Sequence, residues 1–253
     1  MPKTIKNIYD NSVSFENLLK AHKKARCGKR EKKKIILFEL KLEQELLELD
    51  KQLKNGRYKH GGYTKFKIYE PKERIIMASE YKDRVVHQWY VEKFIKPYFV
   101  PQFISTSYAG IEGRGMHKAS KDVQKAMRSA KSKWKNYYIL KMDVTKYFQN
   151  IDKRILWEIL KRKMKDKKLL WLTRKILLST EGMVGLPLGN YTSQMFANIY
   201  LNELDQYVKH KLKCKYYYRY MDDIVILFKT KKDAKEALDK IKKFLIIIKK
   251  GKP

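Results

Sequence analysis

The sequence predicts an α+β fold in which helices back an antiparallel sheet. Between residues 137 and 248 a strand pattern is followed by helical patterns, then by two adjacent strand patterns and a last helix. Strands and helices that are grouped in this way, without regular alternation, are typical of the class. Apolar residues make up 43% of the 253 residues, enough for a sizeable core, and no internal repeat or Pro/Ser-rich linker divides the chain.

Helices are predicted for most of residues 14–54. Phe15, Leu18 and Leu19 recur at helical spacing, and leucines resume the pattern from Leu37 to Leu49. The basic stretch between them, Lys23 to Lys34, is either a solvated loop or a contact to nucleic acid, and we favour the contact.

A basic β-hairpin is predicted next. Tyr63 to Ile68 alternates as a strand does, Arg74 to Met77 reads as its partner, and Pro71-Lys72-Glu73 joins the two. A hairpin with several cations can approach a bound ligand. Helical patterns then cover residues 83–96 and 117–130.

The second half of the chain begins with a strand, Tyr137 to Val144, and continues with helices over 153–164 and 167–179. Glycines and a proline make residues 182–189 a loop. A helix over 192–212 leads to two runs of aromatic and β-branched residues, which favour strands, and to a last helix over 231–248.

The charge of the chain indicates a polyanionic partner. Lys and Arg number 59 against 27 Asp and Glu, a net charge of +32. Nucleic acid is the default partner for such a charge. The cations are spread along the chain among 18 tyrosines, which suits a long groove that follows a nucleic-acid backbone and stacks on its bases.

Other sequence features exclude several classes. Cys27 and Cys214 are the two cysteines and form no paired motif, so neither a disulfide framework nor a zinc site is expected, and a reducing cytoplasm is the natural setting. The first ten residues lack the apolar stretch of a signal peptide. The apolar run Phe244 to Ile248 is too short to span a bilayer. We therefore expect a soluble, cytoplasmic protein with no membrane partner.

Tyr220-Met221-Asp222-Asp223 places two adjacent carboxylates between the last two predicted strands. Such carboxylates repel each other unless a cation holds them. Mg²⁺ is commonly bound by one or two carboxylates together with substrate phosphates. The alternative is a solvated turn that happens to contain two aspartates.

Asp143 follows three apolar or amphipathic residues within a predicted strand, where a charge is costly unless it is paired or metal-bound. The alternative is an aspartate on an edge strand that faces solvent. If Asp143 lies beside Asp222 and Asp223, three carboxylates surround one or two Mg²⁺ ions. In-line transfer of a phosphoryl or nucleotidyl group needs such an arrangement.

Together these residues resemble the palm of a reverse transcriptase. Asp143 is followed five residues later by Phe148, then by the Gly-rich loop and by Tyr-Met-Asp-Asp. The segment from Gly185 to Leu201 is similar to the group encoded by diversity-generating retroelements, because it has Leu188-Gly189 and Ser193-Gln194 where most reverse transcriptases have Gln-Gly and Ser-Pro. The resemblance runs from about residue 9 to 245, and it includes Tyr63, Phe66, Pro71, Lys72, Arg74, Asp83 to His87, Ser107 to Ala109, Gly113 and Gly115.

The resemblance implies a right-hand polymerase fold and a role for each matching residue. Asp143 and Asp222 would bind two Mg²⁺ ions, for which Mn²⁺ can substitute, with Asp223 as the supporting third carboxylate. The ring of Phe148 would be the steric gate that rejects a 2′-hydroxyl and selects dNTPs.

Other residues would contact the nucleotide or the nucleic acid. Lys72 and Arg74, and less directly Arg84, would bind the triphosphate. Leu188, beside Gly189, replaces a glutamine that normally helps to position the nucleotide. Its loss implies lower fidelity, which in the family goes with misincorporation opposite template adenines. The residues expected at the template or primer are Gln194, Tyr220 and Met221.

The resemblance also divides the chain. Residues 1–95 would form the fingers, 96–152 the first part of the palm, 153–186 a helical insertion, and 187–253 the second part of the palm. No thumb follows the helix over 231–248. Either the chain is a fragment or the protein lacks a thumb.

We expect an RNA-directed DNA polymerase of a diversity-generating retroelement that copies template RNA from a primer with dNTPs. The resemblance implies a small, basic, helical accessory protein as a further partner. The rival interpretations are another bacterial reverse transcriptase, of the retron, group II intron or phage-defence type, and a non-catalytic RNA-binding module derived from a polymerase. Phe148 in the gate position disfavours an RNA-dependent RNA polymerase.

Overall fold

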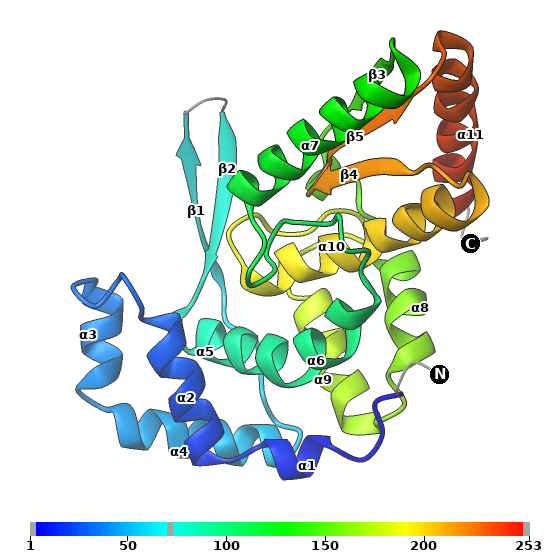
Figure 1. The fold of residues 1–253 in the computed structure, drawn as a ribbon. Coiled ribbons are helices and arrows are strands. Elements are labelled where there is room, and N and C mark those ends of the chain that lie inside the picture. Colours follow the sequence, from blue (N-terminus) through cyan, green and yellow to red (C-terminus); the bar gives the residue numbers. More distant parts are fainter. Residues whose placement is uncertain (1–3, 70–72, 250–253) are drawn as a thin grey trace.

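The computed structural model describes residues 4–69 and 73–249 (Figure 1). The predicted Lys72 contact therefore lies outside the described residues. Four helices begin the chain: α1 (Tyr9–Ser12), α2 (Phe15–Ala25), α3 (Lys33–Glu39) and α4 (Leu42–Lys54). They confirm the helices expected over residues 14–54, and most of the basic stretch is the loop between α2 and α3.

The predicted hairpin is present as β1 (Tyr63–Ile68) and β2 (Arg74–Ser79), paired antiparallel from Tyr63↔Ser79 to Ile68↔Arg74. Figure 1 shows it as an arm that projects from the helices. Its base is held by polar contacts: the Tyr63 hydroxyl lies 2.6 Å from Ser179 Oγ, and the backbone N–H of Met77 donates to the carbonyl of Leu188 at 2.8 Å.

Helix α5 (Tyr81–Tyr90) follows the hairpin and runs through the core. It continues into a π-helical turn (Val91–Ile95), α6 (Lys96–Phe99) and a 3₁₀ turn (Val100–Gln102). Side chains from the α5 segment, such as Val85, Val86 and Trp89, are buried. Because α2 packs along α5, the N-terminal helices and the centre of the molecule share one core.

The second sheet has the order β3-β5-β4, with β3 (Tyr138–Met142), β4 (Tyr216–Tyr220) and β5 (Asp223–Phe228) all antiparallel to their neighbours. Ile224 and Ile226 of β5 face the main core, which includes α10 (Tyr191–Gln206) and α11 (Lys231–Lys249). The predicted α+β class, with an antiparallel sheet backed by helices, is confirmed.

The far face of this sheet is also covered, whereas the sequence predicted helices on one face. Val225 and Leu227 point away from the main core and pack with Ala126 and Ala130 of α7 (Met116–Trp134). Alternate residues of β5 are apolar on both sides, as expected for a central strand with two buried faces.

Two helices lie between β3 and α10: α8 (Lys153–Lys163) and α9 (Lys167–Leu177). Asp166 caps α9 by accepting from the backbone N–H of Leu169 at 3.2 Å, and its second oxygen accepts from Tyr9 N at 3.0 Å. A short 3₁₀ helix (Tyr147–Asn150) precedes α8, and a π-helical turn (Tyr207–Lys211) extends α10.

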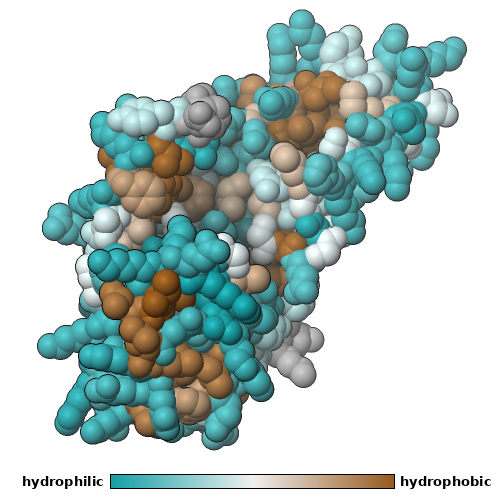
Figure 2. All heavy atoms as spheres, turned by 90° about the vertical axis from the view of Figure 1, so that its left-hand side faces the viewer, coloured by the Kyte–Doolittle hydropathy of each residue, from teal (hydrophilic) through white to brown (hydrophobic). Residues whose placement is uncertain are grey.

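The face of the molecule in Figure 2 is mainly hydrophilic, with apolar patches. Large apolar side chains are exposed on α3, α4 and the junction between them, namely Ile36, Leu37, Leu40 and Leu47. Across residues 4–69 and 73–249, no helix is both long and apolar enough to cross a bilayer.

Candidate active site

The two adjacent aspartates lie at the bend of the β4–β5 hairpin, as predicted. Tyr220 pairs with Asp223, so Met221 and Asp222 form the turn. Two-residue turns of this kind need a residue with positive φ, and Met221 has φ +55°. A methionine in this left-handed region is strained, and such strain persists where the surrounding structure enforces it.

The third aspartate lies beside this turn. Met142, the last residue of β3, pairs with Ile224, so Asp143 follows the strand at the edge where β5 begins. The strand thus ends two residues earlier than the predicted Val144, and Asp143 is exposed just after its end. Burial raises the pKa of Asp222, and the carboxylates of Asp143 and Asp223 raise it further, Asp143 also by a hydrogen bond.

These carboxylates are suitable ligands for a divalent cation whose coordination shell is completed by other ligands. Asp222 is half-buried next to two like charges, a situation that a cation relieves. Among the described residues, no three His, Cys, Asp or Glu side chains converge closely enough to form a metal site by themselves. Mg²⁺ keeps several waters and binds substrate phosphates, so two converging carboxylates are compatible with it.

A buried arginine supports the turn from below. The side chain of Arg219, on β4, donates from Nη1 to the backbone carbonyl of Met221 at 2.9 Å. Its Nη2 and Nε bind the two oxygens of Asp205 on α10 at 2.6 and 2.7 Å. Further bonds reach Asn198 Oδ1 at 3.0 Å and Ser107 Oγ at 3.1 Å.

The Arg219–Asp205 pair is shielded from solvent, with side chains 0% and 0% exposed. Burial opposes the charged form of Arg219, but the Asp205 carboxylate outweighs it and raises the pKa of Arg219. The Tyr217 hydroxyl also donates to Asp205, at 2.6 Å. Breaking such a pair leaves a buried charge without a partner, which is strongly destabilising.

Sequence reasoning missed this cluster. The available signals were Asp205 in a largely apolar helical pattern and Arg219 within a run of tyrosines. The sequence does not indicate that Asp205 and Arg219 are partners. The backbone adds to the link, because Arg219 N donates to Thr106 O at 2.9 Å and Tyr108 N to Arg219 O at 3.0 Å.

Phe148 lies in the 3₁₀ helix that follows Asp143 and is half-buried against the core. Its carbonyl accepts from Leu186 N at 2.8 Å, and Gly185 N donates to Ile151 O at 2.8 Å. The segment that carries Phe148 is therefore tied to the Gly-rich loop.

The same loop contacts the hairpin. A Cβ on Gly189 would lie 2.9 Å from Ile76 Cγ2 and 3.4 Å from the carbonyl of Met77, and Gly189 has φ +110°. Only glycine accommodates both this conformation and this close approach. The half-buried Leu188 joins the contact through its carbonyl.

The remaining predicted residues lie in different settings. Arg74 is exposed at the start of β2, whereas the Arg84 side chain is half-buried and donates from Nε to the Ser79 carbonyl at 3.1 Å. Gln194 is an exposed residue in the largely buried first turns of α10, and Tyr220 is 38% exposed at the end of β4.

A carboxylate pair at the end of an antiparallel sheet, with Asp222 in a strained hairpin turn, defines a candidate nucleotidyl-transfer centre. Residues 59–249, most of the chain, match the reverse transcriptase (RNA-dependent DNA polymerase) family. The chain belongs to this family, which confirms the family-level prediction.

Several known proteins are similar to the chain. Protein YkfC of Escherichia coli (strain K12) is 25% identical over 187 residues, which are 69% of this chain and 48% of that protein. The group II intron-encoded protein LtrA of Lactococcus lactis subsp. cremoris is 25% identical over 185 residues, which are 69% of this chain and 30% of that protein. The chain thus spans less than half the length of these relatives.

Among solved structures, a chain of a partial Cas6-RT-Cas1–Cas2 complex has 19% sequence identity and a TM-score of 0.48. The alignment covers 96% of this chain and 43% of that chain.

Proposed function

We propose that this chain is the catalytic part of an RNA-directed DNA polymerase that extends a primer on an RNA template. The observation that carries the proposal is the proximity of Asp143 to Asp222 where β3 ends and β5 begins, with Asp223 next to Asp222 in the chain. Two Mg²⁺ ions bound there would activate the attacking 3′-hydroxyl and stabilise the leaving pyrophosphate. Asp143 and Asp222 are the proposed direct ligands, and Asp223 is the supporting carboxylate.

The neighbouring residues would select and orient the nucleotide. Phe148 would limit the space beneath the sugar and so reject a 2′-hydroxyl. Arg74, together with Lys72, would bind the triphosphate from the hairpin, with Arg84 as a further cation. The contact of Gly189 and Leu188 with β2 supports this arrangement, because it fixes the loop against the hairpin.

Primer extension tests the activity directly. An RNA template with a DNA primer, Mg²⁺ and either dNTPs or rNTPs should yield DNA from dNTPs. Asp143→Asn and Asp222→Asn should each lower kcat more than about a hundredfold. This exceeds the roughly 10- to 100-fold loss that is usual when the lost residue only orients a metal ligand. Asp239→Asn, on the exposed side of α11, makes the same chemical change away from the site and serves as the control.

The opposite result would favour a different class. If wild-type protein binds RNA but incorporates no nucleotide, even with its accessory protein, and Asp222→Asn binds equally well, the chain is an RNA-binding module and the catalytic proposal fails.

Within the family, we propose the diversity-generating retroelement group. The supporting features are Leu188-Gly189 and Ser193-Gln194. The proposed partners are a template RNA, a primer, dNTPs and a small, basic, helical accessory protein. The relative encoded by a group II intron favours a second candidate, a reverse transcriptase of that type.

Error spectra separate the two candidates. The retroelement enzyme should misincorporate mainly opposite template adenines, and Leu188→Gln should reduce these errors because an amide can again hydrogen-bond near the nucleotide. Leu188→Met keeps the size and apolarity of the side chain and is the matched control. A wild-type spectrum with no adenine bias, unchanged by Leu188→Gln, would favour the group II intron type.

A further inference from the structure

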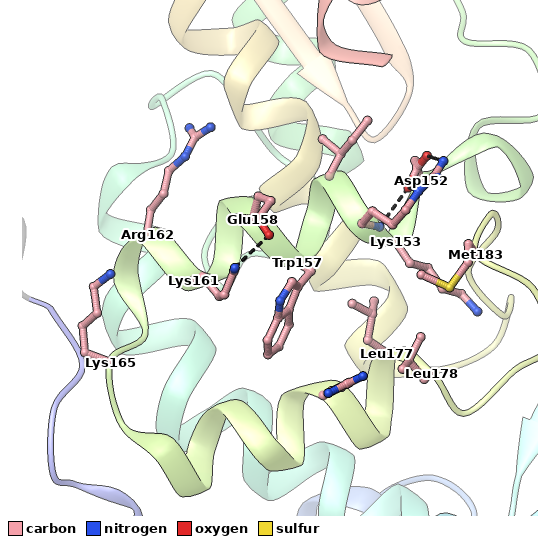
Figure 3. A pocket seen from close by; sticks show the side chains of 13 residues that line it. Asp152, Lys153, Trp157, Glu158, Lys161, Arg162, Lys165, Leu177, Leu178 and Met183 are labelled. Carbon is pink, nitrogen blue, oxygen red and sulfur yellow. Dashed lines mark hydrogen bonds and ion pairs between the residues drawn. The ribbon is translucent and has the colours of Figure 1, made fainter. Parts of the chain in front are cut away.

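A groove of about 1020 Å³ lies between α8 and α9 (Figure 3), and none of Asp143, Asp222 and Asp223 lines it. Its volume is at the upper end of small-molecule sites, so it has room for several groups in a row. Figure 3 shows Trp157 on α8 facing the end of α9, where Leu177 and Leu178 lie. The cations that line it are Lys153, Arg154, Lys161, Arg162, Lys165 and Arg174.

The charge of the groove is positive and largely uncompensated. Against six cations it has two carboxylates, Asp152 and Glu158, a surplus of four positive charges. Both carboxylates are already paired: Asp152 with Arg154 at 2.6 Å and Glu158 with Lys161 at 2.8 Å. Arg162 is paired with Glu203, which does not line the groove, so the uncompensated charge belongs to Lys153, Lys165 and Arg174.

Two of those cations are available to a ligand. Lys165 and Arg174 are exposed, and neither forms an ion pair among the described residues. Arg162 has a looser contact with Glu203, at 3.3 Å.

Lys153 adds a buried charge to the groove wall. Its ammonium donates to the carbonyl of Thr180 at 2.9 Å, to the hydroxyl of the same residue at 2.9 Å and to the carbonyl of Gly182 at 2.8 Å. All three acceptors are neutral, so the positive charge of this side chain is solvated by the protein but not cancelled.

Trp157 provides an aromatic surface in the same groove. It is half-buried against the core, and Lys161 Nζ lies 5.8 Å from its ring centroid. Anchored aromatic rings next to cations are the usual platform for bases of single strands, because every base has a stacking face.

We propose that this groove binds single-stranded nucleic acid, with phosphates at Lys165 and Arg174 and a base against Trp157. The inference rests on the proposed function, since a polymerase of this family handles an RNA template and a DNA product, either of which has the required chemistry. An acidic protein segment would satisfy the charge but leave the tryptophan without a base to stack on.

The position of the groove gives its occupant access to the wall of the active site. Asp152 and Met183 line one end of the groove. Next to these two residues, the backbone N–H of Gly185 donates to the carbonyl of Ile151, and the N–H of Leu186 donates to the carbonyl of Phe148. The end of the groove at Asp152 and Met183 is therefore connected by backbone hydrogen bonds to the segment that carries Phe148.

Binding can be measured without catalysis. Fluorescence anisotropy with labelled twelve-nucleotide oligo(U) and oligo(dT) would be recorded over a range of salt concentrations, without metal or dNTPs. The double variant Lys165→Glu/Arg174→Glu should bind about tenfold more weakly, and its log–log salt slope should fall by about 1.4, roughly 0.7 for each lost phosphate contact. Lys231→Glu/Lys235→Glu, two exposed positions of α11, makes an equal charge change outside the groove and should affect binding much less.

Photo-crosslinking locates the base. An oligonucleotide with 5-iodouridine should crosslink to the peptide that contains Trp157, and Trp157→Phe should move or remove that crosslink while retaining an aromatic ring. Stronger binding of oligo(U) than of oligo(dT) would identify the RNA as the occupant, and the reverse would identify the DNA product.

Three results would overturn the inference. The first is an equal loss of oligonucleotide affinity in the two double variants, and the second is the absence of any crosslink to α8. The third is that poly-glutamate abolishes the crosslink to the groove while the affinity of the protein for oligo(U) stays unchanged. Primer extension by the wild-type protein separates this outcome from a failure of the proposed function. Active protein without groove binding refutes the groove alone, whereas groove binding without nucleotide incorporation refutes the polymerase.

Discussion

Replacing Arg219 with lysine should slow nucleotide incorporation while preserving the positive charge beneath the Met221–Asp222 turn. Arg219 makes five hydrogen bonds, one of them to the carbonyl of Met221. A lysine ammonium has three donors and no planar fork, so it cannot bind both oxygens of Asp205 and also reach Met221. The left-handed conformation of Met221 would then lose the contact that holds it.

The expected magnitude follows from the number of bonds lost. At least two of the five bonds of Arg219 disappear, and each hydrogen bond to a charged group contributes about 1.5–3 kcal/mol. The free energy of unfolding should therefore fall by about 3 kcal/mol or more, a large share of the roughly 5–15 kcal/mol of a typical domain. If the loss of the Met221 bond is felt in the transition state, kcat falls about ten- to a hundredfold.

Steady-state primer extension, at a temperature where urea titration shows the variant to be folded, measures this effect. We expect a lower kcat with little change in KM for the dNTP, because Arg219 orients the turn and does not touch the nucleotide. Ser107→Ala is the matched control: it removes one bond to Arg219 at 3.1 Å and keeps the bonds to Met221 and Asp205. If folded Arg219→Lys protein incorporates nucleotide as fast as the Ser107→Ala protein, the turn does not depend on this arginine.

Three further predictions concern other parts of the molecule. Phe148→Ala should raise the ratio of rNTP to dNTP incorporation at least about tenfold, since the phenyl ring would otherwise exclude the 2′-hydroxyl by its volume. Phe148→Tyr should keep the wild-type ratio. Equal ratios for the wild type and both variants would exclude this ring as the gate. Gly189→Ala should lower the free energy of unfolding by about 1–3 kcal/mol and raise KM for the dNTP, because the new Cβ would lie 2.9 Å from Ile76 and the backbone φ is +110°. An unchanged melting temperature and an unchanged KM would contradict this prediction. Burial, with smaller contributions from His60 and Arg84, lowers the pKa of His87 from 6.5 to about 3. Between these two pH values the unfolded chain binds a proton at His87 that the folded chain does not. The free energy of unfolding should therefore fall as the pH drops from about 6.5 toward 3, by up to about 1.4 kcal/mol per pH unit. Urea titrations at several pH values should show a shallower dependence in His87→Gln, and identical slopes would refute the assignment.

The elements of this chain were largely predictable because its local patterns agree with its fold. The hairpin, the helices on either side of the Gly-rich loop and the strands around Asp222 all follow from the spacing of apolar residues and the placement of glycines. The end of β3 was predicted less well. Val144 continues the apolar pattern, but pairing with β5 stops at Met142, which leaves Asp143 free of the ladder.

The buried polar contacts were not predictable, since each depends on partners far apart in the chain. Asp205 and Arg219 are fourteen residues apart, and Ser107 is 112 residues from Arg219. Only the tertiary fold brings these three side chains together. The covering of the sheet by α7 also depends on tertiary structure. The continuous apolar run Ile224 to Phe228 is typical of a strand with two buried faces, but it does not identify the helix that covers the second face.

The sequence by itself determined the fold class and the family, and it singled out Asp143, Asp222 and Asp223 as candidate metal ligands, because motif spacing and periodicity are local properties of the chain. Tertiary structure alone decided which side chains hold those aspartates in place and where the surplus positive charge is concentrated. Hydrogen bonds act over a few ångströms between residues brought together by folding. The buried support under the Met221 turn and the cationic groove between α8 and α9 therefore become visible only in three dimensions.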